Sequence, residues 1–348
     1  MSHKARLKIL VVFDLNQRVE EGYDFFKEDF KTEGFETEND VCRALKRLGH
    51  DVAPLSLFDD LTPLLAHFRA GVESPPDLIF NLSEAFRVDR RHEPHIAALL
   101  ELLKVPYTGA DSTALALCKD KALAKKILSY HHIKTPRFLV SPRSRPLKRL
   151  RHVGFPAFVK PLATEGSEGI AQAARVEDEK AALERAKFIH ESVGTDALIE
   201  EFIEGRELYA AVVGNDRLQS LPPMELFVGN APLGDADTPE GAPKFFTYRA
   251  KWDAAYRKKW GIRAAVPKDL PADIEKRLGE IARRVYHSLG VKGYGRVDLR
   301  VTPAGEIYVI EVNPNPGLAQ SDEFAKAAAR AEIPYDSLIA RIVQLAER

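Results

Sequence analysis

The sequence predicts an α/β protein whose first part is an open, mostly parallel sheet and whose C-terminal half is α+β. Apolar, strand-like runs alternate with helical patterns through the first 115 residues, as in parallel sheets that are joined by helices. Further strands and helices follow without that regular alternation. Since the 348 residues exceed what one core usually holds, we expect three domains, at 1–115, 116–205 and 206–348.

The N-terminal domain is predicted from short apolar runs and from helical spacing of apolar residues. Strands are expected at 7–13, 51–57 and 77–82, and helices at 38–48 and 94–103. Gly49 directly after the first helix is a typical helix stop. No G-x-G-x-x-G motif follows the first strand, so the sequence gives no support for a dinucleotide-binding domain.

The later elements follow from the same signals. In the second domain we expect a helix at 119–131, a strand at 155–160, a loop at 162–169, a helix at 177–191 and a strand at 197–202. In the third we expect strands at 206–213 and 220–227, a helix at 271–289, and helices at 322–332 and 335–347. The Gly/Pro-rich segment 228–244 is long enough to be a functional lid.

A β-hairpin is predicted at 295–301 and 306–312, with turn residues between the strands. A four-residue turn would place Arg296 opposite Glu311 and Asp298 opposite Val309. Arg296, Asp298, Glu311 and Asn313 would then share one face of the sheet. The other face would be a core face; its members would be Val297, Leu299, Val301, Tyr308, Ile310 and Val312.

Two carboxylates and an amide on one buried sheet face require a partner, because unpaired charges there are costly. Mg²⁺ is the natural candidate, since it binds through one or two carboxylates while substrate phosphates complete its shell. Asp298, Glu311 and Asn313 are therefore candidate metal ligands, with Mn²⁺ as the alternative ion. An ion pair between Arg296 and one of the carboxylates is the competing interpretation.

Composition excludes several classes of function. Lys+Arg and Asp+Glu are equal at 51 each, which argues against a dedicated nucleic-acid binder. The two cysteines, Cys42 and Cys118, are far apart and lack metal-ligand spacing, which favours a reducing compartment. No apolar run is long enough for a membrane span or a signal-peptide core, so we expect a cytoplasmic protein without a membrane partner.

Two further segments are suited to nucleotide binding. An apolar strand ends in Lys160 and is followed at once by a Gly-rich loop, whose backbone N–H groups could approach phosphate oxygens. A Gly-rich turn would explain these glycines equally well. In the segment 198–207, Phe202 and Ile203 flank a backbone edge suited to adenine, and Glu207 is suited to ribose hydroxyls. A charged strand end is the alternative here.

Taken together, these segments resemble the ATP-grasp superfamily, and most closely its D-alanine–D-alanine ligase branch. The similarity extends from about residue 100 to the C-terminus. It is carried in order by Lys119-Asp120-Lys121, Val159-Lys160-Pro161, Glu165-Gly166-Ser167, Ile199-Glu200-Glu201-Phe202, Glu207, Lys251, Gly295-Arg296-Val297-Asp298 and Glu311-Val312-Asn313. The resemblance implies an ATP-grasp fold and an ATP-dependent ligase that acts on a small carboxylate and an amine, working as a homodimer.

The resemblance also implies roles for individual residues. ATP would be bound by Lys121, Lys160, Ser167, Glu200, Glu201, Ile203, Glu207 and Lys251. Arg296 matches the arginine that stabilises oxyanion charge, and Lys251 matches the lysine of the mobile loop. Asp298, Glu311 and Asn313 match the Mg²⁺ ligands.

The substrate half of the chain departs from the family pattern. Asp322 lies where the family places a serine that holds the acceptor's carboxylate, and Trp252 replaces a tyrosine. An aspartate would repel that carboxylate, so we expect an altered substrate; an N-cap role for Asp322 is the alternative. A genuine D-alanine–D-alanine ligase, a non-catalytic ATP-binding protein and a kinase that does not ligate remain open alternatives. The roles of residues 14–36 and 83–93 in substrate binding stay undetermined.

Overall fold

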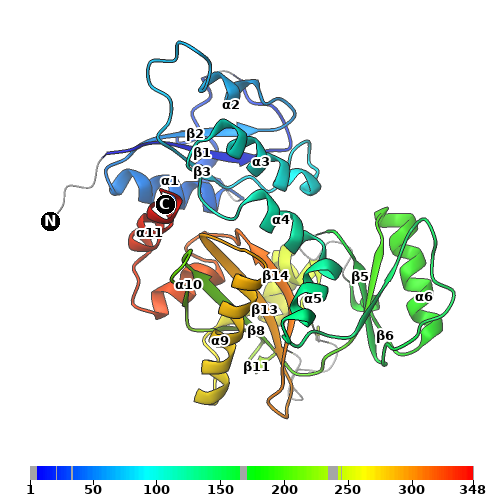
Figure 1. Ribbon diagram of the computed structural model, residues 1–348. Helices are drawn as coiled ribbons and strands as arrows, with labels where there is room; N and C mark the ends of the chain where they lie inside the picture. Colours follow the sequence, from blue (N-terminus) through cyan, green and yellow to red (C-terminus); the bar gives the residue numbers. More distant parts are fainter. Residues whose placement is uncertain are drawn as a thin grey trace.

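The protein contains three β-sheets, which Figure 1 shows together with the helices that accompany them. The structure, a computed structural model, describes residues 6–20, 22–32, 34–164, 171–233, 242–243 and 245–347, without the side chains of Lys31 and Trp252. The sheets lie within residues 8–81, 138–201 and 206–314. The predicted site residue Ser167 and the rest of the segment 165–170, which includes most of the predicted Gly-rich loop, are outside the described part of the chain.

The N-terminal sheet is parallel throughout, as predicted. Its strand order is β2-β1-β3, with β1 (Lys8–Asp14), β2 (Asp51–Leu57) and β3 (Leu78–Asn81). Helices α1 (Glu36–Arg47), α2 (Thr62–Ala66) and α3 (Glu93–Leu103) connect or flank these strands. The middle residues of β1 are buried, which explains its unbroken apolar run.

The central sheet is antiparallel, with the order β4-β7-β5-β6. Its strands are β4 (Phe138–Ser141), β5 (Ala157–Pro161), β6 (Arg175–Val176) and β7 (Ala197–Glu201), and α6 (Glu179–Phe188) packs on one face. The helix expected at 119–131 is divided: α4 (Ser112–Lys119) ends before α5 (Lys121–Tyr130). The Asp120 carboxylate accepts the N–H groups of Ala122 and Leu123, so it caps α5 and separates the two helices.

The C-terminal sheet has the order β11-β10-β8-β13-β14, with β12 paired to β10 and β9 to β8. Its strands are β8 (Arg206–Val213), β9 (Gln219–Ser220), β10 (Met224–Val228), β11 (Ala231–Pro232), β12 (Arg263–Ala265), β13 (Tyr294–Val301) and β14 (Ile307–Pro314). The accompanying helices are α7 (Tyr248–Trp252), α8 (Ala254–Trp260), α9 (Ala272–Ser288), α10 (Glu323–Arg330) and α11 (Tyr335–Ala346).

The predicted hairpin exists, but its predicted register is wrong. Arg296 pairs with Asn313 and Asp298 with Glu311, and the register then shifts at a bulge between Asp298 and Leu299. The bulge inserts Ile310 as an extra residue on β14. The four polar side chains still alternate onto one face, because the register differs from the prediction by an even number of residues at that end.

Because of the bulge, the core face of the hairpin differs from the predicted one. Val297, Leu299, Val301 and Val312 are buried in one apolar cluster, as expected. Tyr308 and Ile310 are only half-buried and do not belong to that cluster. Ile310 instead lines the central cavity, because the extra residue interrupts the alternation of faces.

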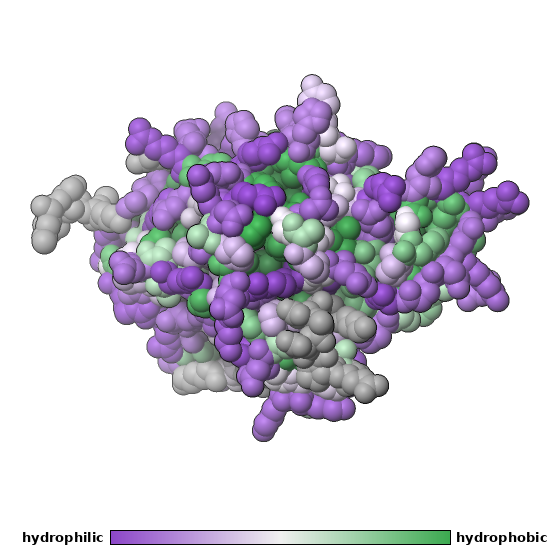
Figure 2. All heavy atoms as spheres, turned by 90° about the horizontal axis from the view of Figure 1, so that it is seen from below, coloured by the Kyte–Doolittle hydropathy of each residue, from purple (hydrophilic) through white to green (hydrophobic). Residues whose placement is uncertain are grey.

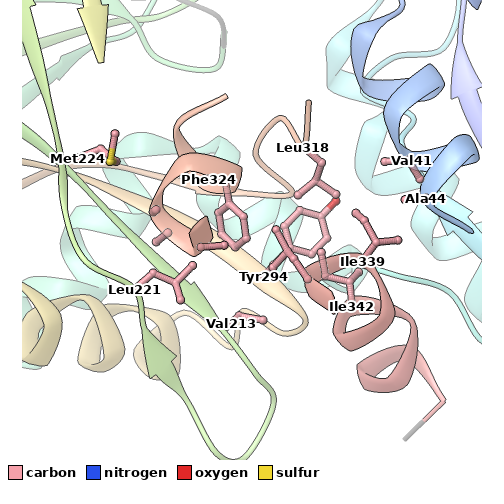
Figure 3. Close-up of a cluster of buried hydrophobic side chains, with 14 of the residues drawn as sticks. Val41, Ala44, Val213, Leu221, Met224, Tyr294, Leu318, Phe324, Ile339 and Ile342 are labelled. Atoms are coloured by element: carbon pink, nitrogen blue, oxygen red, sulfur yellow. The ribbon is translucent and has the colours of Figure 1, made fainter. Parts of the chain in front are cut away.

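The N-terminal and C-terminal sheets share one apolar core. Figure 3 shows Val41 and Ala44 of α1 facing Ile339 of α11, with Leu318 between them and the Tyr294–Phe324 pair. Burial of such side chains contributes about 1.5–3 kcal/mol each. This shared core fixes the position of α1 relative to the chain that follows β14.

The surface is mixed in polarity. On the face seen in Figure 2, hydrophilic side chains occupy most of the periphery and apolar ones are visible mainly near the middle. Both cysteines are buried and unpaired with each other. Within the described part of the chain, no helix combines the length and apolar character that a membrane crossing requires.

Candidate active site

A cavity of about 600 Å³ lies where the three sheets meet. It collects most of the residues that the sequence singled out, from elements far apart in the chain. Lining it are Lys160, Glu200, Glu201, Ile203, Glu207, Lys251, Arg296, Asp298, Glu311, Asn313 and Asp322. Lys121 lies beside it and contacts Glu311, whereas Ser167 and the side chain of Trp252 are outside the described structure.

A buried cluster of opposite charges lies at one end of the cavity. The Glu200 carboxylate on β7 is 2.7 Å from Lys160 Nζ and 3.1 Å from Lys125 Nζ, and each side chain is 3% exposed. Burial alone would raise the pKa of Glu200, but Lys125 and Lys160 outweigh burial and lower it. Lys125 also donates to the Ile310 carbonyl at 2.9 Å, so it joins the bulge to this cluster.

An aromatic wall stands next to this cluster. The rings of Phe158, Phe202 and Phe245 pack together, with centroids 4.8–6.1 Å apart. Arg300 donates to the Ile203 carbonyl at 3.0 Å and to the Glu207 carboxylate at 2.8 Å. The apolar rings offer a flat surface, and Arg300 holds the carboxylate of Glu207 beside it.

The polar face of the hairpin forms the floor of the cavity. Arg296 makes two hydrogen bonds to Asp298, at 2.7 and 3.0 Å, and its guanidinium stacks 4.4 Å over the ring of buried Tyr209. Asn313 Nδ2 donates to the same carboxylate at 3.0 Å. The ion pair considered as an alternative to a metal site therefore forms, with Asp298 as the acceptor.

The two carboxylates of this face lie directly opposite each other. Burial raises the pKa of Asp298 to about 6, with Arg296 opposing the rise and Glu311 adding to it. Burial would also raise the pKa of Glu311, but Lys121 at 3.2 Å and Lys160 outweigh burial and lower it to about 2. Paired carboxylates with one elevated pKa are suited to a divalent cation.

The donor set fits Mg²⁺ better than a transition metal. Asp298, Glu311 and Asn313 offer hard oxygens, which Mg²⁺ and Mn²⁺ prefer. Among the residues that the structure describes, no three His, Cys, Asp or Glu side chains are grouped so that they could hold a metal alone. A metal at this face would therefore depend on further oxygens, such as those of a phosphate chain.

Lys251 reaches the same floor from α7. It lines the cavity, and burial together with the positive charge of Arg296 lowers its pKa. Thr247 caps α7 by accepting the Ala250 N–H at 3.2 Å, which fixes the helix that carries Lys251. Two basic groups thus face the part of the cavity next to Asp298.

Asp322 also lines the cavity, from the turn that follows β14. It occupies the N-cap position of α10, as the alternative interpretation predicted, but its side chain makes no capping bond. Its carboxylate accepts the Ala319 N–H at 3.0 Å instead. Burial and the neighbouring Glu323 raise the pKa of Asp322 to about 6.

Several residues of the site escaped sequence reasoning. Lys125 follows Lys121 by one helical turn, and that spacing on a buried helix face could have revealed it. Tyr209 and Arg300 alternate with core residues on β8 and β13, which gave no distinct signal. The N-terminal domain adds Asp14 and Glu38, which lie at the ends of elements with no recognised motif.

Comparisons with known proteins agree with this arrangement. Residues 121–344 match the family model described as D-ala D-ala ligase C-terminus. A D-alanine–D-alanine ligase of Pelotomaculum thermopropionicum is 33% identical over 261 residues, covering 72% of this chain and 75% of that protein. The uncharacterized protein y4sG of Sinorhizobium fredii is 31% identical over 320 residues, covering 88% and 86%.

Solved structures show the same fold. The ATP complex of D-alanine–D-alanine ligase from Bacillus anthracis superposes with a TM-score of 0.73 at 22% identity, covering 98% of both chains. VanG D-Ala:D-Ser ligase from Enterococcus faecalis gives 0.69 at 21% identity, covering 98% of this chain and all of that one. The prediction of an ATP-grasp fold is confirmed.

Proposed function

Because this chain belongs to the D-alanine–D-alanine ligase family of ATP-grasp enzymes, which form C–N bonds, we propose that it joins a carboxylate to an amine other than D-alanine. The proposal rests mainly on one observation. Arg296, Asp298, Glu311 and Asn313 share one face of the β13–β14 hairpin, beside a cluster of buried lysines.

A carboxylate is a poor acylating agent near neutral pH, so it must be activated before an amine can attack it. A carboxylate oxygen attacks the γ-phosphorus of ATP, the bond to the β-phosphate oxygen breaks, and an acyl phosphate and ADP form. The amine nitrogen then attacks the carbonyl carbon, inorganic phosphate leaves, and the displaced proton passes to solvent. Arg296 supplies fixed N–H donors for the tetrahedral oxyanion, a type of contribution worth about 3 kcal/mol.

The nucleotide would occupy the end of the cavity with the aromatic wall. Phe158, Phe202 and Phe245 are suited to an adenine ring, and Glu207 to ribose. The remaining assignments are Lys121, Lys160 and Ser167 to the phosphates, and Glu200, Glu201 and Ile203 to adenine. Mg²⁺ or Mn²⁺ held by Asp298, Glu311 and Asn313 would offset phosphate charge.

A lid would protect the acyl phosphate from water. The segment 228–250 ends beside Lys251, and its described part includes Phe245, which belongs to the aromatic wall, and Phe246, which lines the cavity. Closure of such a segment excludes water and completes the set of charged groups.

The acceptor would differ from D-alanine. Asp322 lies in the cavity wall. The resemblance aligns it with a serine that holds the acceptor's carboxylate, and an aspartate there would repel that carboxylate. The competing function is D-alanine dimerisation, which the names of the relatives favour. We also expect a cytoplasmic homodimer, with Trp252 near the substrate.

Mass spectrometry of products from pooled amino acids and amines, with ATP and Mg²⁺, tests this function. We expect an ATP-dependent amide together with stoichiometric ADP and phosphate. The variant Arg296→Ala should form no product and should bind the nucleotide as the parent does. Saturable D-alanine dimerisation would establish the competing function. ADP release with a phosphorylated product and no need for an amine would indicate a kinase.

A further inference from the structure

Resting on the proposed function, we propose that the acceptor is an amine with a second cationic group, such as an aliphatic diamine, and that Asp322 and the N-terminal wall of the cavity bind this second group. The inference comes from a difference between the two ends of the cavity in how their carboxylates are neutralised.

At the nucleotide end, the protein neutralises its own carboxylates. Each has a lysine or arginine nitrogen within 4.0 Å. These pairs are Glu200 with Lys125 and Lys160, Glu201 with Arg137, Glu207 with Arg300, Glu311 with Lys121, and Asp298 with Arg296. This end is therefore electrostatically complete before any substrate enters.

At the opposite end, several carboxylates lack such a partner. Among the described residues, Asp14, Glu36, Glu38 and Asp322 line the cavity without an ion pair. Two of the nearby cations are engaged, since Arg90 pairs with Glu84 at 2.8 Å and Arg296 with Asp298, while Lys251 and Arg257 also line the cavity. Carboxylates still outnumber cations at this end of the cavity, and a cationic substrate would balance them.

The fold brings these carboxylates to one place. Leu318 is buried in the shared core, and Gln320 makes two 2.8 Å hydrogen bonds to Asp40 of α1. The turn that carries Asp322 is therefore fixed against the helix whose first turn carries Glu38. Figure 3 shows Leu318 beside Val41 of α1 and Ile339 of α11 at this junction.

Gly317 makes room for the Asp322 carboxylate. A Cβ at this position would lie 2.5 Å from Asp322 Oδ2, so a side chain here would displace the carboxylate. Together with the hydrogen bond from the Ala319 N–H, this space holds Asp322 in the cavity wall.

A buried hydroxyl independently indicates a ligand at the same wall. Ser83 Oγ has no hydrogen-bond partner among the described residues, although Ser83 is only 3% exposed. Ser83 lines the cavity just beyond the carboxyl end of β3, next to β1, where strand order reverses and α/β sheets bind ligands. An unsatisfied buried group is costly, and a hydroxyl oxygen can accept a hydrogen bond from an ammonium group.

The titration behaviour of the wall agrees with this assignment. Burial, with a smaller contribution from Glu84 and Asp14, raises the pKa of Glu38 to about 7, and burial also raises the pKa of Asp14. An ammonium group among these carboxylates would lower those values and stabilise the ionised forms.

The test compares 1,4-diaminobutane with butylamine, which differ by the second ammonium group. Binding of each, and of D-alanine, is measured calorimetrically to the full chain with a non-hydrolysable ATP analogue and Mg²⁺. We expect 1,4-diaminobutane to bind at least tenfold more tightly than butylamine, and D-alanine to bind more weakly than 1,4-diaminobutane. Equal binding of the two amines, undetectable binding of the diamine, or tighter binding of D-alanine overturns the inference.

Variants locate the second group. Asp322→Asn should reduce the preference for the diamine to threefold or less, while Glu184→Gln, an exposed helix residue outside the cavity, should leave it unchanged. Unchanged affinity for the ATP analogue shows that Asp322→Asn is folded; if that variant does not fold, Glu38→Gln serves in its place and should also reduce the preference. An unchanged preference in the folded variant refutes the assignment.

The outcomes separate this inference from the proposed function. Diamine binding without ATP-dependent product in the pooled assay supports the subsite and contradicts the ligase. Ligation of a simple monoamine together with weak diamine binding supports the ligase and contradicts the subsite.

Discussion

Replacing Glu200 by glutamine removes the negative charge that lies between the ammonium groups of Lys125 and Lys160. The change keeps the size of the side chain but leaves two buried cations without their nearest carboxylate. We expect the variant to be strongly destabilised and to bind ATP weakly, because both lysines are held in place by this carboxylate.

The magnitude follows from burial and distance. All three side chains are 3% exposed, at 2.7 and 3.1 Å, and removing one partner of a buried pair costs about 3–5 kcal/mol. Lys160 keeps some compensation from Glu311, so we expect a loss of about 3 kcal/mol in the free energy of unfolding. The neighbouring Glu201→Gln is the matched control: its partner Arg137 is 68% exposed, and such a pair is worth below about 1 kcal/mol.

Urea denaturation at neutral pH measures both variants, with nucleotide affinity measured in parallel. The slope of unfolding free energy against urea should be unchanged, so that midpoints report stability. In a Lys125→Met background, Glu200→Gln should cost about 1–3 kcal/mol less, because the two residues interact directly. The reasoning is refuted if Glu200→Gln destabilises no more than Glu201→Gln does.

Three further predictions concern the hairpin and the N-terminal wall. Asp298→Asn should raise the Mg²⁺ concentration for half-maximal activity at least about tenfold, since it removes a ligand; an unchanged requirement contradicts the metal site. Arg296→Lys should lower kcat by about 10²–10³ with unchanged ATP affinity, and a loss of affinity alone would argue for a structural role. Glu38 has a pKa raised from 4.5 to about 7, so the folded state retains a proton that the unfolded state has lost, and stability falls as pH rises through this range. Glu38→Gln should therefore be more stable than the parent at pH above about 7, by up to about 3 kcal/mol, and equal below about pH 4; a difference in Tm that does not vary with pH contradicts this.

The hairpin illustrates what could be predicted from the sequence. Alternation along β13 places Arg296 and Asp298 on one face whatever the register, and Glu311 and Asn313 of β14 share that face provided that the register differs by an even number of residues. The bulge between Asp298 and Leu299 leaves no mark in the apolar pattern, since Ile310 continues the apolar run that begins at Ile307. Its exposure to the cavity could therefore not be predicted.

The charged residues differ in the same way. Lys121 and Lys160 were predicted because each lies in a recognisable segment, whereas the one signal for Lys125 is its spacing of one helical turn from Lys121. Its role depends on Glu200, some 75 residues later, and on a carbonyl exposed by the bulge. Such partnerships arise only from tertiary packing.

The two ends of the cavity imply different degrees of preorganisation. Charges that the protein pairs internally are held at fixed positions, so the nucleotide end can receive a substrate with little rearrangement. Carboxylates such as Asp322 and Glu38 have no ion-pair partner among the residues that the structure describes, and their neutralisation depends on what binds. Binding energy for the acceptor would then be largest for a ligand that brings positive charge, and a zwitterion such as D-alanine would gain at one group what it loses at the other. The same arrangement that makes ATP binding independent of the acceptor thus makes acceptor selection a matter of charge.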